Sequence, residues 1–125
     1  MQTETHISSN SILECSCGCG FKPTASALWF LHSLARQYHA LFGKDMTVTS
    51  GARCYARNKA VGGVSNSAHT KGLAFDVAYA NSRECYAILE HLYKMGIKRI
   101  GINFAKSFVH FDIDASLPQE VLFKY

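Results

Sequence analysis

The sequence is poor in the features that mark disordered chains. Only two of its 125 residues are proline, and charged residues make up 18% of it against 48% that are hydrophobic. Disordered chains combine few hydrophobic residues with abundant charge or proline, so this composition excludes that class. A chain of this length can bury a core of its own, and we expect one folded domain over residues 1–125.

The sequence also lacks a long hydrophobic run. No apolar stretch approaches the ~18 residues that a membrane-spanning helix needs. The first six residues, MQTETH, contain neither a basic segment nor an apolar one, so no secretory leader is recognisable. We therefore expect a protein that is synthesised in the cytoplasm without a signal peptide and has no membrane span.

Basic residues do not cluster. The chain has 13 lysines and arginines and nine acidic residues, for a net charge of +4, but Lys98 and Arg99 form its one adjacent basic pair. Proteins that bind nucleic acid usually concentrate positive charge in a stripe or run. We therefore expect no nucleic-acid partner, although a mild positive charge still favours association with polyanions.

The five cysteines are odd in number, so they cannot all pair within the chain. Three of them lie in residues 15–20, CSCGCG, while Cys54 and Cys85 stand alone. A structural zinc site normally takes two closely spaced pairs of ligands, and a second pair is missing here. We expect free or buried thiols, or a contact between one of the three N-terminal cysteines and Cys54, as a disulfide or as packing.

The pattern of apolar residues predicts an α+β fold. Apolar spacings of three and four predict two main helices, at 24–42 and 81–95. Alternating or β-branched runs predict four strands, at 46–50, 73–79, 97–104 and 108–113. The last two strands are close enough in sequence to form a hairpin, so we expect a small, largely antiparallel sheet. Residues 51–70 are expected to form a long irregular loop, which in a compact domain is usually functional.

Three residues combine the chemistry of metal ligands with informative positions. His69 ends the long loop, and Asp76 lies in the next strand on the side opposite its large apolar residues. Alternation along residues 108–114 places His110 and Asp112 on one face. Two imidazoles and a carboxylate suit Zn²⁺, which in catalytic sites keeps a fourth position for water. Spacing alone leaves open that these are solvated or hydrogen-bonded residues without a metal.

The residues around these positions resemble the zinc D-Ala-D-Ala carboxypeptidase superfamily, the M15 peptidases. Residues 67–76, SAHTKGLAFD, are similar to its S-x-H-x-x-G-x-A-x-D motif, and residues 108–112, FVHFD, resemble its FVHvD ending. SGAR at 50–53, followed by Asn58 and VGG at 61–63, is similar to its SGyR…N…VGG stretch. The segment CSCGCG resembles the cysteine-rich start of short phage and prophage members. The resemblance covers residues ~12–114, and the motifs follow one another in the same order as in the family.

The resemblance implies a Hedgehog/DD-peptidase-like fold, with His69, Asp76 and His110 as the ligands of a zinc ion. Arg53 matches the family arginine that holds the carbonyl or carboxylate of the substrate, a task suited to its planar fork of donors. Ser67 is expected to donate a hydrogen bond to the substrate or to support a ligand. The alternatives are an exposed loop arginine and a turn serine.

One position departs from the family pattern. Many relatives carry Glu or Asp three residues before the last histidine, as general base, and here that position is Ser107, which cannot accept a proton at neutral pH. Asp112 is expected either to act as the base or to orient His110, and we favour the base role. Asp114, one step further along the same face, is expected to be solvated.

The function implied by the resemblance is that of a zinc-dependent peptidase. Its expected substrate is the stem peptide of peptidoglycan, cleaved by a D,D-carboxypeptidase or by an endopeptidase of the phage-lysin kind. The protein, expected to be a monomer, would reach the cell wall after release or as part of a phage particle. The alternative, suggested by Ser107, is a non-catalytic zinc-containing module that binds the cell wall or a protein. A non-haem iron site beginning with His110 and Asp112 lacks a later histidine to complete it.

Overall fold

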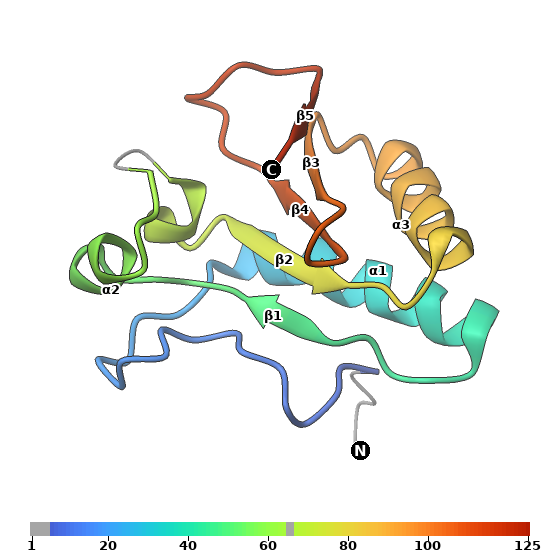
Figure 1. The fold of residues 1–125 in the computed structure, drawn as a ribbon, viewed down its shortest axis with the longest axis horizontal. Coiled ribbons are helices and arrows are strands. Elements are labelled where there is room, and N and C mark those ends of the chain that lie inside the picture. Colours follow the sequence, from blue (N-terminus) through green and yellow to red (C-terminus); the bar gives the residue numbers. More distant parts are fainter. Residues whose placement is uncertain (1–5, 65–66) are drawn as a thin grey trace.

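The computed structural model describes residues 6–64 and 67–125 (Figure 1). Within these residues the helices are α1 (Ala25–Phe42), α2 (Tyr55–Ala60), the 3₁₀ helix η1 (Ala68–Lys71) and α3 (Ser82–Lys94). The strands are β1 (Val48–Ser50), β2 (Ala74–Ala78), β3 (Arg99–Asn103), β4 (Phe108–Asp112) and β5 (Val121–Lys124). None of the described helices is both long and apolar enough to cross a membrane.

The five strands form one sheet in the order β1-β2-β4-β3-β5. All neighbouring pairs are antiparallel except β3 and β5, which run parallel. The predicted hairpin of β3 and β4 is present, and β4 lies at the centre of the sheet. The expected α+β fold, with a largely antiparallel sheet and two main helices, is confirmed.

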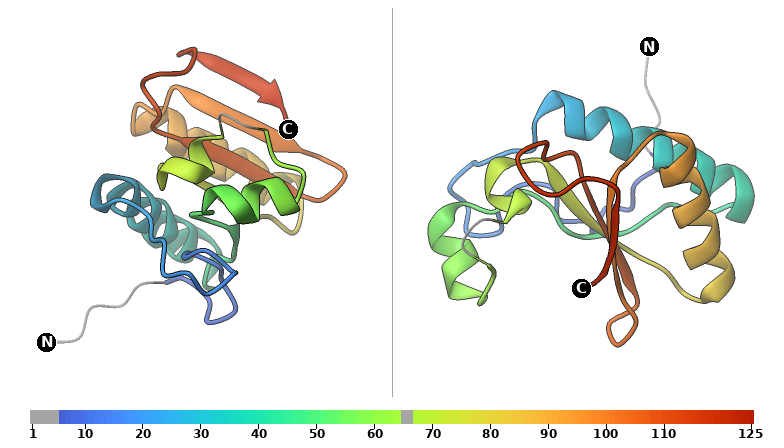
Figure 2. Two further views of the ribbon diagram at one scale, coloured as in Figure 1. Left: turned by 90° about the vertical axis from the view of Figure 1, so that its left-hand side faces the viewer. Right: turned by 90° about the horizontal axis from the view of Figure 1, so that it is seen from above.

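Helices α1 and α3 cover one face of this sheet. Both begin at capping residues: the Thr24 hydroxyl accepts a hydrogen bond from the Ala27 N–H, and the Asn81 side chain accepts one from the Glu84 N–H. Their apolar sides pack against alternate residues of the central strands, including Phe75 and Phe111. In the right-hand view of Figure 2, α3 lies on one side of the strands, while α2 and the C-terminus lie on the other. The second face of the sheet is therefore free to carry polar side chains.

The N-terminal segment runs beside β1 without forming a helix or strand of its own. The Ile12 N–H donates to the carbonyl of Val48 at 2.8 Å, and the Ala52 N–H donates to the carbonyl of Leu13 at 2.9 Å. A Cβ atom at Gly51 would overlap the backbone oxygen of Leu13. Glycine is therefore required for the close approach of the two segments.

The structure corrects two of the expectations about secondary structure. Residues 51–70, predicted to be irregular, contain α2 and all but the last residue of η1, and residues 65–66 lie outside the described part. These helices are too short to show an apolar period, and each begins at a side-chain cap, Cys54 or Ser67. Strand β5 was not predicted, because it depends on a long-range parallel pairing with β3 that local patterns do not reveal.

Candidate metal centre

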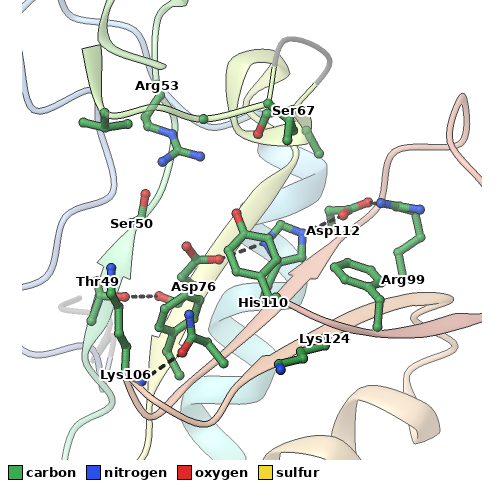
Figure 3. Close-up of a pocket in the computed structure, with 18 of the residues that line it drawn as sticks. Thr49, Ser50, Arg53, Ser67, Asp76, Arg99, Lys106, His110, Asp112 and Lys124 are labelled. Atoms are coloured by element: carbon green, nitrogen blue, oxygen red, sulfur yellow. Dashed lines mark hydrogen bonds and ion pairs between the residues drawn. The ribbon is translucent and has the colours of Figure 1, made fainter. Parts of the chain in front are cut away.

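The strand register brings two of the three expected ligands together. Asp76 on β2 lies directly opposite His110 on β4, so both side chains project from the face of the sheet that α1 and α3 leave uncovered. Their side chains meet with the Asp76 Oδ1 atom 2.9 Å from the His110 Nδ1 atom (Figure 3). The third, His69, comes from η1, and its Nε2 atom lies 3.2 Å from the same carboxylate oxygen.

The three residues form one buried group. One ligand atom from each of His69, Asp76 and His110 lies within 4.8 Å of the others. Burial raises the pKa of Asp76, but its close contacts with the His110 and His69 imidazoles outweigh this effect and hold it below its ordinary value. The group therefore presents an ionised oxygen between two imidazoles, which is a donor set that zinc accepts.

Each imidazole is fixed through the nitrogen that faces away from Asp76. The Nδ1 atom of His69 lies 2.7 Å from the carbonyl oxygen of Gly51. Because a carbonyl oxygen can only accept, Nδ1 donates, and in the neutral ring Nε2 has the lone pair that a metal ion needs. The Nε2 atom of His110 lies 2.7 Å from Oδ2 of Asp112. Outer acceptors of this kind orient metal-binding histidines, so the residues fit a zinc ion.

Both carboxylate oxygens of Asp112 are engaged. Its Oδ2 contacts His110, while its Oδ1 accepts from the Arg99 Nε–H at 2.8 Å and from the Asp114 N–H at 3.1 Å. Its side chain has no exposed area. Of the two roles expected for Asp112, these contacts favour the orientation of His110. Its position on the outer nitrogen of His110 also separates it from the ligand group.

Asp114 and Ser107, two further positions considered in the sequence analysis, lie close to His110 in the sequence. Asp114 was expected to be solvated, but it is buried, because Lys71 of η1 reaches it with a nitrogen–oxygen distance of 2.7 Å. Ser107 lies at the turn before β4, where its carbonyl accepts a hydrogen bond from the Tyr79 N–H. It is not among the described residues that line the cavity beside the metal group.

This cavity has a volume of about 840 Å³ and carries excess positive charge. The basic residues on its walls are Arg53, Arg99, Lys106 and Lys124, and its side-chain carboxylates are Asp76 and Asp112. Arg99 is neutralised by Asp112. The charge that remains favours an anionic ligand close to the metal group.

Arg53 and Ser67, both predicted to act on the substrate, line the same cavity. The Arg53 N–H donates to the carbonyl of His69 at 3.0 Å, which anchors the arginine beside η1. Its side-chain Nε–H is buried and has no hydrogen-bond partner in the described part of the chain. A buried donor of this kind is costly unless a ligand satisfies it. Ser67 caps η1 by accepting from the His69 N–H at 3.2 Å, so it helps to position a ligand as well.

Two aromatic residues at the C-terminal end, Phe123 of β5 and Tyr125 directly after it, form a wall that sequence reasoning missed. The ring of Tyr125 stacks on His110 with centroids 4.5 Å apart and an angle of 14°. Phe123 lies beside it over Gly101, where a Cβ atom would collide with the phenyl ring. Burial, together with the charge of Asp76, raises the pKa of Tyr125 to about 12, so its hydroxyl remains a donor at neutral pH. The signal in the sequence was the β-prone run VLFKY at 121–125.

Comparison with known proteins supports the arrangement. A sequence model of a protein family described as peptidase M15 matches residues 6–112. The match spans Arg53, Ser67, Asp112 and the three members of the buried group, and it stops before β5. No curated protein matches the sequence.

Proposed function

The chain belongs to the peptidase M15 family, and from this membership we propose that it is a zinc-dependent peptidase that cleaves stem peptides of peptidoglycan. The cleavage is that of a D,D-carboxypeptidase or of an endopeptidase of the phage-lysin kind. The observation that carries the proposal is the buried group of His69, Asp76 and His110 beside a positively charged cavity. Such a cavity can admit a peptide to the metal.

In this proposal His69, Asp76 and His110 hold the ion. Zinc supplies Lewis-acid polarisation of a peptide carbonyl and lowers the pKa of a bound water towards neutrality. The carbonyl of Gly51 fixes the tautomer of His69, and Asp112 fixes the ring of His110. These contacts preorganise the ligands, so little reorganisation is required when the metal binds.

Arg53 binds the substrate in this proposal. Its buried and unpartnered Nε–H is directed into the cavity, where a peptide carbonyl or a terminal carboxylate can accept from it. Lys106 and Lys124 add long-range attraction for a carboxylate. The protonated hydroxyl of Tyr125, which lies close to Arg53, offers a further donor in the cavity. A peptide with a free C-terminus, as in a stem peptide, satisfies this set of donors.

A second candidate function follows from the shortage of proton acceptors. Besides Asp76, which is a ligand, Asp112 is the one side-chain carboxylate among the described residues that line the cavity. It is already bonded to His110 and Arg99. A non-catalytic, zinc-containing module that binds cell wall or protein would need no acceptor at all. In the peptidase, Asp112 is the remaining candidate base as well as the partner of His110.

The two functions are separated by mass analysis of purified peptidoglycan fragments before and after treatment, with and without a chelator. The peptidase should release fragments only with metal present, and His69→Ala should abolish release while removing one zinc per chain. His32→Ala on α1 is the matched control and should retain both properties. Metal-loaded protein that leaves every wall substrate intact would overturn the peptidase. In that case, binding of intact wall that survives Asp112→Asn would support the second function.

A further inference from the structure

Four cysteines from two distant segments meet on the surface beside α2. Cys15, Cys17 and Cys19 lie in the N-terminal segment, and Cys54 directly precedes α2. One sulfur from each lies within 4.8 Å of all the others. We call this set the cysteine cluster. It confirms the expected contact with Cys54, and all four thiols are free.

The spacing of the sulfurs fits a tetrahedral metal site. The Cys15 and Cys17 sulfurs are 3.3 Å apart, and each lies 3.6 Å from the Cys54 sulfur. Four thiolates at about 2.3 Å from one zinc ion stand about 3.8 Å from one another. A disulfide would bring two sulfurs to about 2.05 Å and would leave the other two without a role. The four sulfurs could therefore bind one metal ion without a large rearrangement of the chain.

Backbone N–H groups stabilise negative charge on the sulfurs of Cys15 and Cys54, whereas contacts with the neighbouring thiols raise the pKa of Cys17 to about 12. The Cys54 N–H donates to the Cys15 sulfur at 3.3 Å, and the Arg57 N–H donates to the Cys54 sulfur at 3.4 Å. Burial raises the pKa of Cys15, but hydrogen bonds from its neighbours outweigh this effect and lower it to about 6. Cys17 and Cys19 are exposed, so an ion can reach the cluster from solvent.

We propose that the cysteine cluster binds one zinc ion as a structural site with four thiolate ligands. Sequence reasoning looked for a second pair of closely spaced ligands and found only one group of three. The fold supplies the missing ligand, Cys54, through the long-range contact between the N-terminal segment and the start of α2. Binding converts thiols to thiolates and releases their protons, so affinity rises with pH.

The proposed site would tie an irregular segment to the metallopeptidase centre. Residues 8–22 form no helix or strand, and they are held to the rest of the chain by contacts such as Ala52 N–H to the Leu13 carbonyl. The connection that ends at Cys54 also carries Arg53 and the Gly51 carbonyl that orients His69. Zinc in the cluster would hold that connection in place. This consequence rests on the proposed function, whereas metal binding by the cluster does not.

The test uses His69→Ala protein, purified under reducing conditions, so that the buried group no longer contributes metal. It should retain one zinc per chain, where the unaltered protein holds two. Loaded with Co²⁺, it should show the near-ultraviolet charge-transfer absorbance of cobalt–thiolate bonds. Cys17→Ser with Cys19→Ser should lose both signals, and these exposed positions limit the effect on folding. Cys85→Ser, which alters a buried cysteine outside the cluster, is the matched control and should retain both.

Three results would overturn the proposal. The first is His69→Ala protein that is folded by circular dichroism yet holds no zinc and gives no cobalt–thiolate absorbance. The second is bound iron with acid-labile sulfide in place of zinc. The third is a mass lower by two hydrogens in unreduced protein, assigned to a disulfide within the cluster. If the proposed function is wrong, a different result is expected: the cobalt–thiolate absorbance is retained, but wall peptides are not cleaved.

Discussion

The Oδ2 atom of Asp112 lies 2.7 Å from the Nε2 atom of His110, two positions earlier on the same strand. Arg99, from β3, holds the other oxygen of the same carboxylate at 2.8 Å. This chain of contacts runs from a cation through a carboxylate to an imidazole whose second nitrogen faces Asp76. Arg99 holds Asp112 in place, and Asp112 in turn fixes the ring of His110.

Asp112→Asn should weaken zinc binding at the buried group. The asparagine amide has one oxygen, which can accept from His110 or from Arg99 but not from both at their present positions. Its NH₂ group is a donor and would face the donor of the other residue. Loss of such an outer partner typically costs 10–100-fold in metal affinity or activity, and we expect about that loss in zinc affinity. Competition with a chromophoric chelator measures it, after the cysteine cluster has been removed by Cys17→Ser with Cys19→Ser.

The same variant separates the two roles of Asp112. A base that does not support the ligand would leave zinc affinity unchanged and reduce turnover alone. Orientation of His110 requires that affinity falls as well. Glu90→Gln, a change to an exposed glutamate on α3, is the control and should alter neither quantity. Unchanged zinc affinity in Asp112→Asn would contradict the orienting role.

Arg53→Ala should impair cleavage without releasing the metal. A hydrogen bond between charged groups contributes about 1.5–3 kcal/mol, which corresponds to a loss of roughly 10- to 150-fold in kcat/KM. Arg53→Lys should recover only part of this loss, since an ammonium cannot reproduce the planar fork. Lys59→Ala removes an exposed charge from α2 and serves as the control. Unchanged kinetics in Arg53→Ala would remove this residue from the substrate site.

Gly51→Ala should reduce both stability and metal binding. The added methyl meets the backbone oxygen of Leu13, and backbone atoms cannot move aside as the end of a flexible side chain can. Overpacking of this kind costs about 1–3 kcal/mol. The shift also moves the Gly51 carbonyl away from His69. Chemical denaturation and zinc titration measure the two effects.

Gly43→Ala is the matched comparison for this variant. Gly43 ends α1 with a φ of 67°, and a Cβ there meets no atom. Alanine in this left-handed conformation costs about 1–2 kcal/mol but does not touch the site. Equal losses of zinc affinity in the two variants would show that the Gly51 carbonyl has no specific role in orienting His69.

The three members of the buried group could be singled out from the sequence because the family motifs around them, and the alternation along two of the strands, are local features. Alternation along β2 and β4 placed Asp76 and His110 on polar faces. The motif around His69 supplied the third member. The pairing of β2 with β4, which brings Asp76 opposite His110, is a long-range contact that local patterns do not specify, because α3 and β3 lie between these strands in the sequence.

The remaining features depend on contacts between distant segments. Tyr125 reaches His110 because β5 adds to β3 in parallel, and nothing in the local pattern specifies that edge. Asp114 is buried because Lys71, 43 positions earlier, neutralises it. Cys54 joins the other cysteines through the same kind of contact. A charged residue or a thiol considered by itself in the sequence is therefore expected to be exposed. The fold can bury it by bringing a distant partner beside it.

Glu84 provides a test of stability away from the metal group. Its side chain is buried between α1 and α3, where it accepts from the Tyr38 hydroxyl at 2.7 Å and from the Ala80 N–H at 2.9 Å. Lys44 lies 2.8 Å from its second oxygen. Burial raises the pKa of Glu84, but Lys44 and these donors outweigh this effect and lower it. The folded state therefore favours the ionised form.

A lowered pKa in the folded state fixes the sign of the pH dependence. The stabilisation from Glu84 is complete above the unfolded value of about 4.3 and is lost as the pH falls through the lower folded value. Glu84→Gln should reduce the free energy of unfolding at neutral pH by about 1–3 kcal/mol and flatten its decline in acid. Urea denaturation between pH 7 and the acid limit measures both, with Glu90→Gln as the exposed control. An acid decline as steep in Glu84→Gln as in the unaltered protein would mean that other carboxylates cause it.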